Sequence, residues 1–474
     1  MKRDGKGGGL SVWAREGFHL TSTRRVRMER NIVKDKSENS SEGFTRRDFV
    51  KYLFAGSALS LSALSKANAA IYQNIASLNQ KYIEDESPDG VYWDALRKSF
   101  LFEDNLVMMN CGTVGPMPQP VFNTLTRIFR TQVVNPYDVY NFLPEKEEEL
   151  RAKLAKFINA SPDEVSITGN TTEGINFVVS GLDLQEGDEV IISNMEHPGA
   201  LRPWKLKEKR FGIKIKQVPL AFPPKSVSEI VDAFAKAITP KTKIISVAHT
   251  VFISGLISPL KELSQIAHEK GILILADSAH GLGMLNLDMK LLGVDFFVSS
   301  PYKWLGAPTG IGLLYVKKDV QDRVWPTIVG ARGDWTTMKS ARKFDPSGQR
   351  ADALVYALDE ALDFQNLIGK ERIERRIKTL AGYLKRELSK IPGVKLNTSE
   401  DPYLSAGLTS FAMEGLAPDK IVDYVREKYN IVVRTIGNKE AGTYALRVSS
   451  PIYISFNEIN MFLEGVRHLS HYKA

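Results

Sequence analysis

Short apolar runs alternate with longer stretches of helical periodicity through the middle of the chain. The run at residues 272–276 is apolar at every position, which is typical of a strand covered on both faces. Residues 261–269 carry apolar side chains at helical spacing and end near Gly271, just before that run. This alternation predicts an α/β fold with a mainly parallel seven-stranded sheet and helices on both faces. The predicted strands are residues 165–168, 190–193, 213–218, 244–248, 272–276, 296–299 and 311–316.

The pattern changes after Gly330. Residues 335–350 are polar, and two amphipathic helices are predicted at 351–364 and 370–389 before a mixed segment that runs to the end of the sequence. We therefore expect an N-terminal segment and large domain over residues 71–345, followed by a smaller α+β domain over residues 346–474.

The first 70 residues have the features of an export signal. Residues 45–51 contain Arg46-Arg47 in a twin-arginine pattern, a weakly apolar stretch follows at 52–64, and small residues end at Ala69. An uncleaved membrane anchor is the alternative, but the apolar stretch is shorter than the roughly 20 residues that span a bilayer. The pattern predicts export by the twin-arginine machinery, cleavage after Ala69 or Ala70, and a periplasmic location without a stable membrane anchor. Met28 offers a second start site.

Charge and cysteine content exclude several classes of protein. The chain has 474 residues and a formal charge of +8, and residues 1–70 alone hold 14 Lys and Arg against 7 Asp and Glu. The rest is nearly neutral, which argues against a nucleic-acid partner, because a domain that binds phosphate backbones carries its positive charge on the folded surface. Cys111 is the sole cysteine, so no intramolecular disulfide forms and no cysteine-rich metal site is expected.

Polar residues follow the predicted strands at the edge of the sheet where ligands bind in open α/β folds. Thr171 and Thr172 follow the first strand and open a helix, which suits either a phosphate or a simple helix cap. Asp277 ends the fifth strand, and Lys303 follows the sixth. A carboxylate and a lysine beside a phosphate cradle are what pyridoxal phosphate requires, although an ordinary salt bridge would use the same pair.

Several ordered motifs resemble the class V aminotransferase branch of fold-type I pyridoxal-phosphate enzymes, which includes isopenicillin N epimerases, cysteine desulfurases and kynureninases. The motifs lie at residues 109–116, 169–176, 195–197 with Pro203-Trp204, and 277–312. The resemblance extends over most of the chain beyond the leader. It implies pyridoxal 5'-phosphate as the cofactor and a homodimer, because the site lies at a subunit boundary in this family.

The resemblance also implies roles for individual residues. Lys303 would form the Schiff base, Asp277 would pair with the pyridine nitrogen, and His197 would stack on the ring. Arg447 would bind the substrate carboxylate, for which a guanidinium fork is suited, whereas a surface ion pair is the alternative. His280 would contact the phenolic oxygen, and the phosphate would be held by Thr171, Thr172, Ser300 and Tyr302.

The leading hypothesis is an aminotransferase that acts on an amino acid, or on the amino-acid moiety of a peptide. An amino-acid epimerase is the first alternative, and a periplasmic protein that binds the cofactor without turnover is the second. Residues 433–438, where a desulfurase presents its nucleophilic cysteine, contain none, which argues against cysteine desulfuration. Cys111 is expected to be a small, half-buried residue. A nicotinamide-dependent enzyme is excluded because no GxGxxG follows the first strand.

Overall fold

The computed structural model describes residues 46–82, 90–330, 336, 339–345, 348–437 and 443–471, with side chains described from residue 64 onward. The chain divides into two units, residues 1–56 and 57–474. All three sheets and all site residues described below belong to the second unit. Of the predicted leader, residues 1–45 lie outside the described residues, and so does Thr45 of the twin-arginine pattern.

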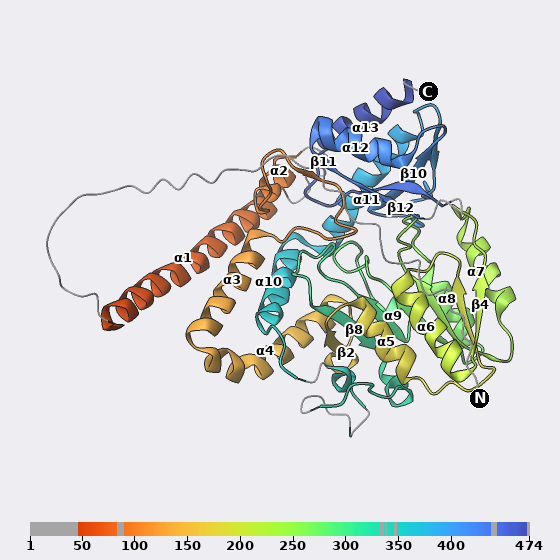
Figure 1. Cartoon of the computed structure of the whole chain (residues 1–474), viewed down its shortest axis with the longest axis horizontal. Coiled ribbons are helices and arrows are strands. Elements are labelled where there is room, and N and C mark those ends of the chain that lie inside the picture. Colours follow the sequence, from red (N-terminus) through yellow and green to blue (C-terminus); the bar gives the residue numbers. More distant parts are fainter. Residues whose placement is uncertain are drawn as a thin grey trace, which may run out of the picture. The chain divides into compact units, whose positions relative to one another are not determined.

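A seven-stranded sheet forms the centre of residues 57–474 (Figure 1). Its strands are β2 (Val165–Thr168), β3 (Glu189–Ser193), β4 (Lys214–Val218), β5 (Thr242–Ala248), β6 (Leu273–Asp277), β7 (Phe296–Ser299) and β8 (Gly312–Val316). They lie in the order β2-β8-β7-β6-β5-β3-β4, in which β8 is antiparallel to both neighbours and all other pairs are parallel. The predicted fold class is confirmed, and every predicted strand lies within two residues of an observed one.

Residues 91–368, which include this sheet, contain nine helices and three short 3-10 turns in their described part. The helix predicted at 261–269 is present, shifted by one residue. The helices are α2 (Val91–Arg97), α3 (Gln119–Val134), α4 (Pro136–Phe157), α5 (Thr171–Gly181), α6 (Pro198–Phe211), α7 (Val227–Ala237), α8 (Leu260–His268), α9 (Met289–Leu292) and α10 (Ala353–Ile368), and the 3-10 turns are η1 (Pro162–Glu164), η2 (Lys318–Arg323) and η3 (Ala341–Phe344).

Both faces of the sheet are buried, because successive side chains of a strand point to opposite faces. On β3, Val190 belongs to a cluster with Trp204 of α6, whereas Ile191 belongs to a second cluster with Phe234 of α7 and Leu263 of α8. The uniformly apolar strands of the sequence are therefore explained by helices that cover both faces.

The C-terminal part has a second sheet of four strands. It contains β9 (Val394–Leu396), β10 (Leu408–Met413), β12 (Arg434–Ile436) and β13 (Ala445–Ser449), in the antiparallel order β12-β13-β10-β9. Helices α11 (Lys370–Leu388), α12 (Pro418–Tyr429) and α13 (Phe456–His471) belong to the same part. A short parallel pair, β1 (Val107–Met108) with β11 (Ile431–Val432), brings the motif at residues 109–116 beside this sheet.

The long helix α1 (Arg46–Lys81) contains the predicted cleavage position. In its second half, Ile75 is buried. The side-chain amide of Asn68 donates a hydrogen bond to the carbonyl oxygen of Pro120 at 3.2 Å and accepts one from the amide of Asn123 at 2.9 Å. Residues on both sides of Ala69 and Ala70 thus pack on the folded body. Within the described part of the chain, no helix combines the length and apolar character needed to cross a membrane.

Candidate active site

The residues predicted at the strand ends line one cavity of about 500 Å³ at the carboxyl edge of the large sheet. An adjoining cavity of about 710 Å³ extends toward the small sheet. Lys303, Tyr302, His197 and His280 line both of them, so the two cavities form one continuous site. The first cavity also contains Thr171, Thr172, Asp277 and Ser300, and the second contains Arg447.

Lys303 lies in a tight turn after β7, and the N-terminal motif packs directly against this turn. The backbone N–H of Gly115 donates to the carbonyl oxygen of Tyr302 at 3.0 Å. A Cβ atom at position 115 would lie 2.2 Å from the carbonyl oxygen of Lys303, so glycine is required there. Burial lowers the pKa of the Lys303 amine to about 8, against the opposing attraction of Asp277. The site therefore holds a lysine that gives up its proton far more readily than a surface lysine.

Asp277 is the last residue of β6 and is buried, with 6% of its surface exposed. Its Oδ1 accepts a hydrogen bond from the backbone N–H of Ala279 at 3.1 Å. Burial raises the pKa of the carboxyl group, and the charges of Lys303 and His197 partly counteract this. A positively charged ring nitrogen beside it would favour the carboxylate further, which is the environment that a pyridinium ring needs.

His280 is fully enclosed, and one neighbour defines its tautomer. The indole N–H of Trp304 donates to His280 Nδ1 at 3.2 Å, so in the neutral ring the hydrogen is carried by Nε2. Burial holds the pKa of His280 well below its usual range, which keeps the ring neutral. Nε2 lies 3.4 Å from the Nζ atom of Lys303. His280 therefore presents an N–H donor to whatever oxygen occupies the space beside the lysine.

His197 caps the N-terminus of α6, where its Nδ1 accepts a hydrogen bond from the backbone N–H of Gly199 at 3.0 Å. The ring packs edge-on against Phe252, with the ring centres 4.9 Å apart. Burial lowers the pKa of His197, although Asp277 opposes this change. These contacts hold the imidazole at the wall of both cavities.

The N-terminus of α5 forms an anion cradle. Asn170 caps this helix by accepting a hydrogen bond from the backbone N–H of Glu173 at 3.0 Å. The hydroxyl groups of Thr171 and Ser300 lie 2.7 Å apart, which joins the first strand end to the lysine turn. Thr172 and Tyr302 line the same cavity. The helix dipole and several hydroxyls in one place suit a phosphate.

Arg447 reaches this site from β13 of the small sheet and is buried, with 3% of its surface exposed. Its guanidinium group donates to the carbonyl oxygen of Phe252 at 3.1 Å, to the hydroxyl of Thr113 at 3.1 Å and to Asn110 Oδ1 at 3.4 Å. These contacts differ from the ion pair that a surface arginine would make. An arginine at this position can grip a carboxylate that enters the second cavity.

Several polar residues of the site were not singled out from the sequence. His249 follows β5, and its Nδ1 lies 2.9 Å from the hydroxyl of Ser278, directly beside Asp277. The hydroxyl of Thr250 is buried without a hydrogen-bond partner in the first cavity. Glu196 and Arg434 line the second cavity. The signal for His249 and Thr250 was their place after a strand, the same signal that identified Asp277.

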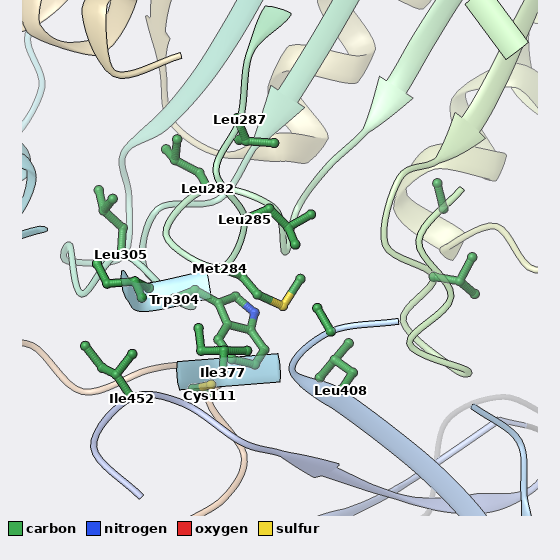
Figure 2. Close-up of a cluster of buried hydrophobic side chains, with 14 of the residues drawn as sticks. Cys111, Leu282, Met284, Leu285, Leu287, Trp304, Leu305, Ile377, Leu408 and Ile452 are labelled. Carbon is green, nitrogen blue, oxygen red and sulfur yellow. The ribbon is translucent and has the colours of Figure 1, made fainter. Parts of the chain in front are cut away.

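Cys111 is fully buried rather than half-buried, with 1% of its surface exposed. Figure 2 shows it in a cluster of apolar side chains with Trp304, Ile377 and Leu408. Burial raises the pKa of its thiol to about 12. The expectation of half-burial was wrong because parallel pairing of β1 with β11 draws this motif under the small sheet. A neutral, enclosed thiol is poorly suited to nucleophilic chemistry.

The donor set of the site fits pyridoxal phosphate. A lysine with a lowered pKa, a buried carboxyl group, an anion cradle and a histidine N–H donor lie around one cavity, and each matches one part of the cofactor. No group of three or more His, Cys, Asp or Glu side chains within the described ranges could hold a metal ion. The fold and the site together define the class of pyridoxal-phosphate enzymes with a mainly parallel α/β sheet.

Comparison with known proteins identifies the family. The model of the family described as aminotransferase class-V matches residues 115–462, so the chain belongs to the class V aminotransferase family. The isopenicillin N epimerase of Streptomyces clavuligerus is 28% identical over 393 residues, covering 80% of this chain and 98% of the relative. The probable cysteine desulfurase of Halalkalibacterium halodurans is 32% identical over 331 residues, covering 67% of this chain and 80% of the relative.

Solved structures agree with this assignment. A mutant of C-DES with glycine covalently linked to its PLP cofactor superimposes with a TM-score of 0.72 at 26% identity, over 78% of this chain and 98% of the other. The cysteine desulfurase CsdA of Escherichia coli gives a TM-score of 0.70 at 25% identity, over 80% and 98%. The prediction of a fold-type I architecture with pyridoxal phosphate as cofactor is confirmed.

Proposed function

We propose that the protein is an aminotransferase that acts on an amino group next to a carboxylate, in a free amino acid or at the end of a peptide. One observation carries this proposal: Lys303 and Asp277 line a single cavity that continues to the buried arginine Arg447. Family membership supports the class of enzyme, and the choice of reaction rests on the arrangement of acids and bases around the lysine.

In this site the bound cofactor supplies an electron-withdrawing ring that acidifies the hydrogen on the substrate's α-carbon. We assign the transfer of that proton to Lys303. Its lowered pKa of about 8 lets the amine alternate between base and acid near neutral pH. Asp277 would stabilise the positive charge of the ring nitrogen in this buried place, and His197 would hold the ring. The neutral His280 would donate its Nε2 hydrogen to an oxygen beside the lysine.

The cofactor's phosphate and the substrate's carboxylate are assigned to different cavities of the site. We assign the phosphate to Thr171, Thr172, Ser300 and Tyr302 around the α5 N-terminus. We assign the substrate's α-carboxylate to Arg447. A single base beside the α-carbon would be sufficient for transamination, because Lys303 can both accept a proton and release it on the same side of the site.

Epimerisation is the second candidate, and it is favoured by one feature of the site besides the named relatives. Glu196 lines the same cavity as Lys303, and its Oε2 is buried without a hydrogen-bond partner. Burial raises the pKa of this carboxyl group to about 7, and the nearby Asp277 adds to the effect. A protonated acid that lines the same cavity as Lys303 could serve as the second proton donor that epimerisation requires.

Cysteine desulfuration is disfavoured by the cysteine content. Relatives with that name are similar to this chain over much of its length. The sequence has one cysteine, Cys111, and it is buried among apolar side chains with its thiol neutral. A persulfide-forming nucleophile needs an accessible thiolate.

We further propose that the protein forms a homodimer. Apolar side chains are exposed along α3 and α4, where a monomer would leave them in water. A second copy is the occupant that the family relationship favours. The exposed residues are Phe122, Phe129, Val133, Tyr137, Tyr140 and Phe142.

Export to the periplasm by the twin-arginine machinery remains a proposal that rests on the sequence pattern around Arg46 and Arg47. That pathway carries folded proteins, which suits a chain that acquires its cofactor before export. Amino-terminal sequencing of protein recovered from the periplasm tests the proposal. A start after Ala69 or Ala70 is expected, and recovery of the full chain from the cytoplasm alone would contradict it.

Two measurements test the activity. Borohydride reduction of the cofactor-loaded protein, followed by peptide mapping, should label the peptide that contains Lys303, and label on another lysine would overturn the site. Incubation with an amino acid and a 2-oxo acid in deuterated water should then give the exchanged pair of amino and oxo acids. Deuterium at the α-carbon with mixed stereochemistry and no oxo product would instead establish epimerisation, and Glu196→Gln should abolish that reaction specifically.

A further inference from the structure

Two arginines of the small sheet face each other at the substrate end of the site. Arg434 on β12 and Arg447 on β13 are direct partners in the antiparallel register. Both donate to the same acceptor, the hydroxyl of Thr113, each at 3.1 Å. The two guanidinium groups are therefore held on the same side of the sheet around one oxygen atom.

No acid neutralises this pair within the described part of the chain. Arg434 otherwise donates to the carbonyl oxygen of Thr435, and Arg447 to Phe252 and Asn110. The Nε of Arg447 is buried and has no hydrogen-bond partner. Like charges directly opposite each other in an antiparallel sheet destabilise it, and burial increases the cost. Burial and the charge of Arg434 lower the pKa of Arg447 to about 10, which reflects the same repulsion. Such an arrangement is stabilised when anions bind.

The two arginines differ in exposure and in their electrostatic effect on the reacting amine. Arg447 is buried, whereas Arg434 is exposed, and both line the cavity that contains Lys303. Both arginines act electrostatically on Lys303, and the effect of Arg447 is the larger. The buried arginine is the one to which we assign the α-carboxylate, and the exposed one is open to solvent at the same cavity.

We propose that Arg434 binds a second carboxylate of the substrate, so that the preferred substrates are amino acids, or amino-acid ends of peptides, that carry a carboxylate remote from the α-carboxylate. This proposal rests on the proposed function, in which the α-carboxylate binds Arg447. One anion at each guanidinium offsets both charges. A single carboxylate shared by the two arginines would leave a net positive charge in the cavity.

The test uses the cofactor-loaded protein and ligands that cannot react. Isothermal titration calorimetry compares succinate, glutarate and adipate with their monoamides, which have the same length and one carboxylate less. At least one diacid should bind about tenfold more tightly than its monoamide, equivalent to about 1.4 kcal/mol. Arg434→Gln should reduce this preference to within twofold and leave the affinity for the monoamide unchanged. Arg434→Lys should retain part of the preference.

Arg426→Gln is the matched control, because Arg426 lies exposed on α12 and outside both cavities. It should leave the preference intact. Two results would overturn the inference. One is that no diacid binds more tightly than its monoamide in the unsubstituted protein. The other is that Arg434→Gln loses the same affinity for the diacid and for the monoamide, which would mean that both arginines bind one carboxylate. These ligands have no amino group, so their binding can be measured without any reaction. If the diacid preference depends on Arg434 but the protein turns over no amino acid, the proposed function is overturned and the second carboxylate site remains.

Discussion

The cofactor end and the substrate end of the site differ in how their charges are balanced. At the cofactor end, Lys303 faces Asp277, and the histidines are neutral and hydrogen-bonded. At the substrate end, Arg434 and Arg447 face each other without an acid among the described residues. The opposite charges at the cofactor end attract each other, whereas the like charges at the substrate end are held together by the pairing of β12 with β13. The difference agrees with our proposal that the large sheet holds the cofactor and that the small sheet binds anions, which complete that end of the site.

The largest effect is expected for Lys303→Ala. In the proposed function, the amine is both the attachment point of the cofactor and the group that moves the proton, so turnover should fall by about 10⁴-fold. Steady-state kinetics of the reconstituted variant measures this loss. Lys207→Ala, which removes another buried lysine that lines neither cavity, should keep turnover. A Lys303 variant with substantial activity would show that the proton is moved by another group.

Asp277→Asn tests the charge balance of the cofactor end. An amide cannot stabilise a protonated ring nitrogen, so kcat should fall by about 10³-fold with little change in KM. The absorption spectrum of the bound cofactor should change as well, which a purely structural role of Asp277 would not cause. Asp277→Glu keeps the charge and should recover part of the rate. Equal activity of the Asn variant would remove Asp277 from the mechanism.

Arg447→Gln tests the substrate end. Loss of the buried guanidinium should cost about 3 kcal/mol of substrate binding, or roughly 150-fold in kcat/KM, mostly through KM. The spectrum of the bound cofactor should change far less than in Asp277→Asn, because Asp277 and Lys303 are retained and only the electrostatic effect of Arg447 on Lys303 is removed. A spectral change as large as that of Asp277→Asn would mean that a substitution at the substrate end also alters the cofactor end. Arg426→Gln serves as the control again.

The rate at which the cofactor-free protein captures pyridoxal phosphate should depend on pH. Attack on the aldehyde requires a neutral amine, and the pKa of Lys303 is lowered to about 8. The neutral fraction, and with it the rate, should rise about tenfold from pH 7 to pH 9 and level off above that. Stopped-flow absorbance measures the rate. A rise that continues beyond pH 10 would show an ordinary lysine pKa.

Cys111→Ala should have the smallest effect. The thiol is buried and neutral, so activity should change by less than about twofold, while the lost packing should cost about 1 kcal/mol of unfolding free energy. Thermal unfolding and steady-state kinetics measure the two quantities. A loss of activity comparable to that of Arg447→Gln would assign Cys111 to the chemistry.

Much of the cofactor end could be predicted from sequence, because each of its residues lies at the end of a strand or within a few residues after it. Asp277, Thr171 and Lys303 could be placed at one edge once the apolar runs were identified as parallel strands. His249 follows β5 in the same way and was passed over, because a histidine after a strand has no signature by itself. Its contact with Ser278 depends on the neighbouring strand and is visible only in the structure.

The substrate end shows what the sequence could not provide. Arg447 was found through its motif, but Arg434 lies 13 positions earlier and becomes its neighbour only through the register of β12 and β13. Strand register depends on which side chains of two segments are buried together, and local patterns do not encode it. The depth of Cys111 was likewise misjudged, since β1 pairs with a strand more than 300 residues away.

The sequence by itself determined the order of strands and helices, the strand-end residues of the cofactor site and the family. These follow from local periodicity and from the rule that parallel strands end at one edge. Only the tertiary structure decided which charges lie opposite each other: the neutral tautomer of His280 beneath Trp304, and the uncompensated pair of arginines across the small sheet. Charge interactions depend on distance through space and on burial, and both are properties of the folded chain.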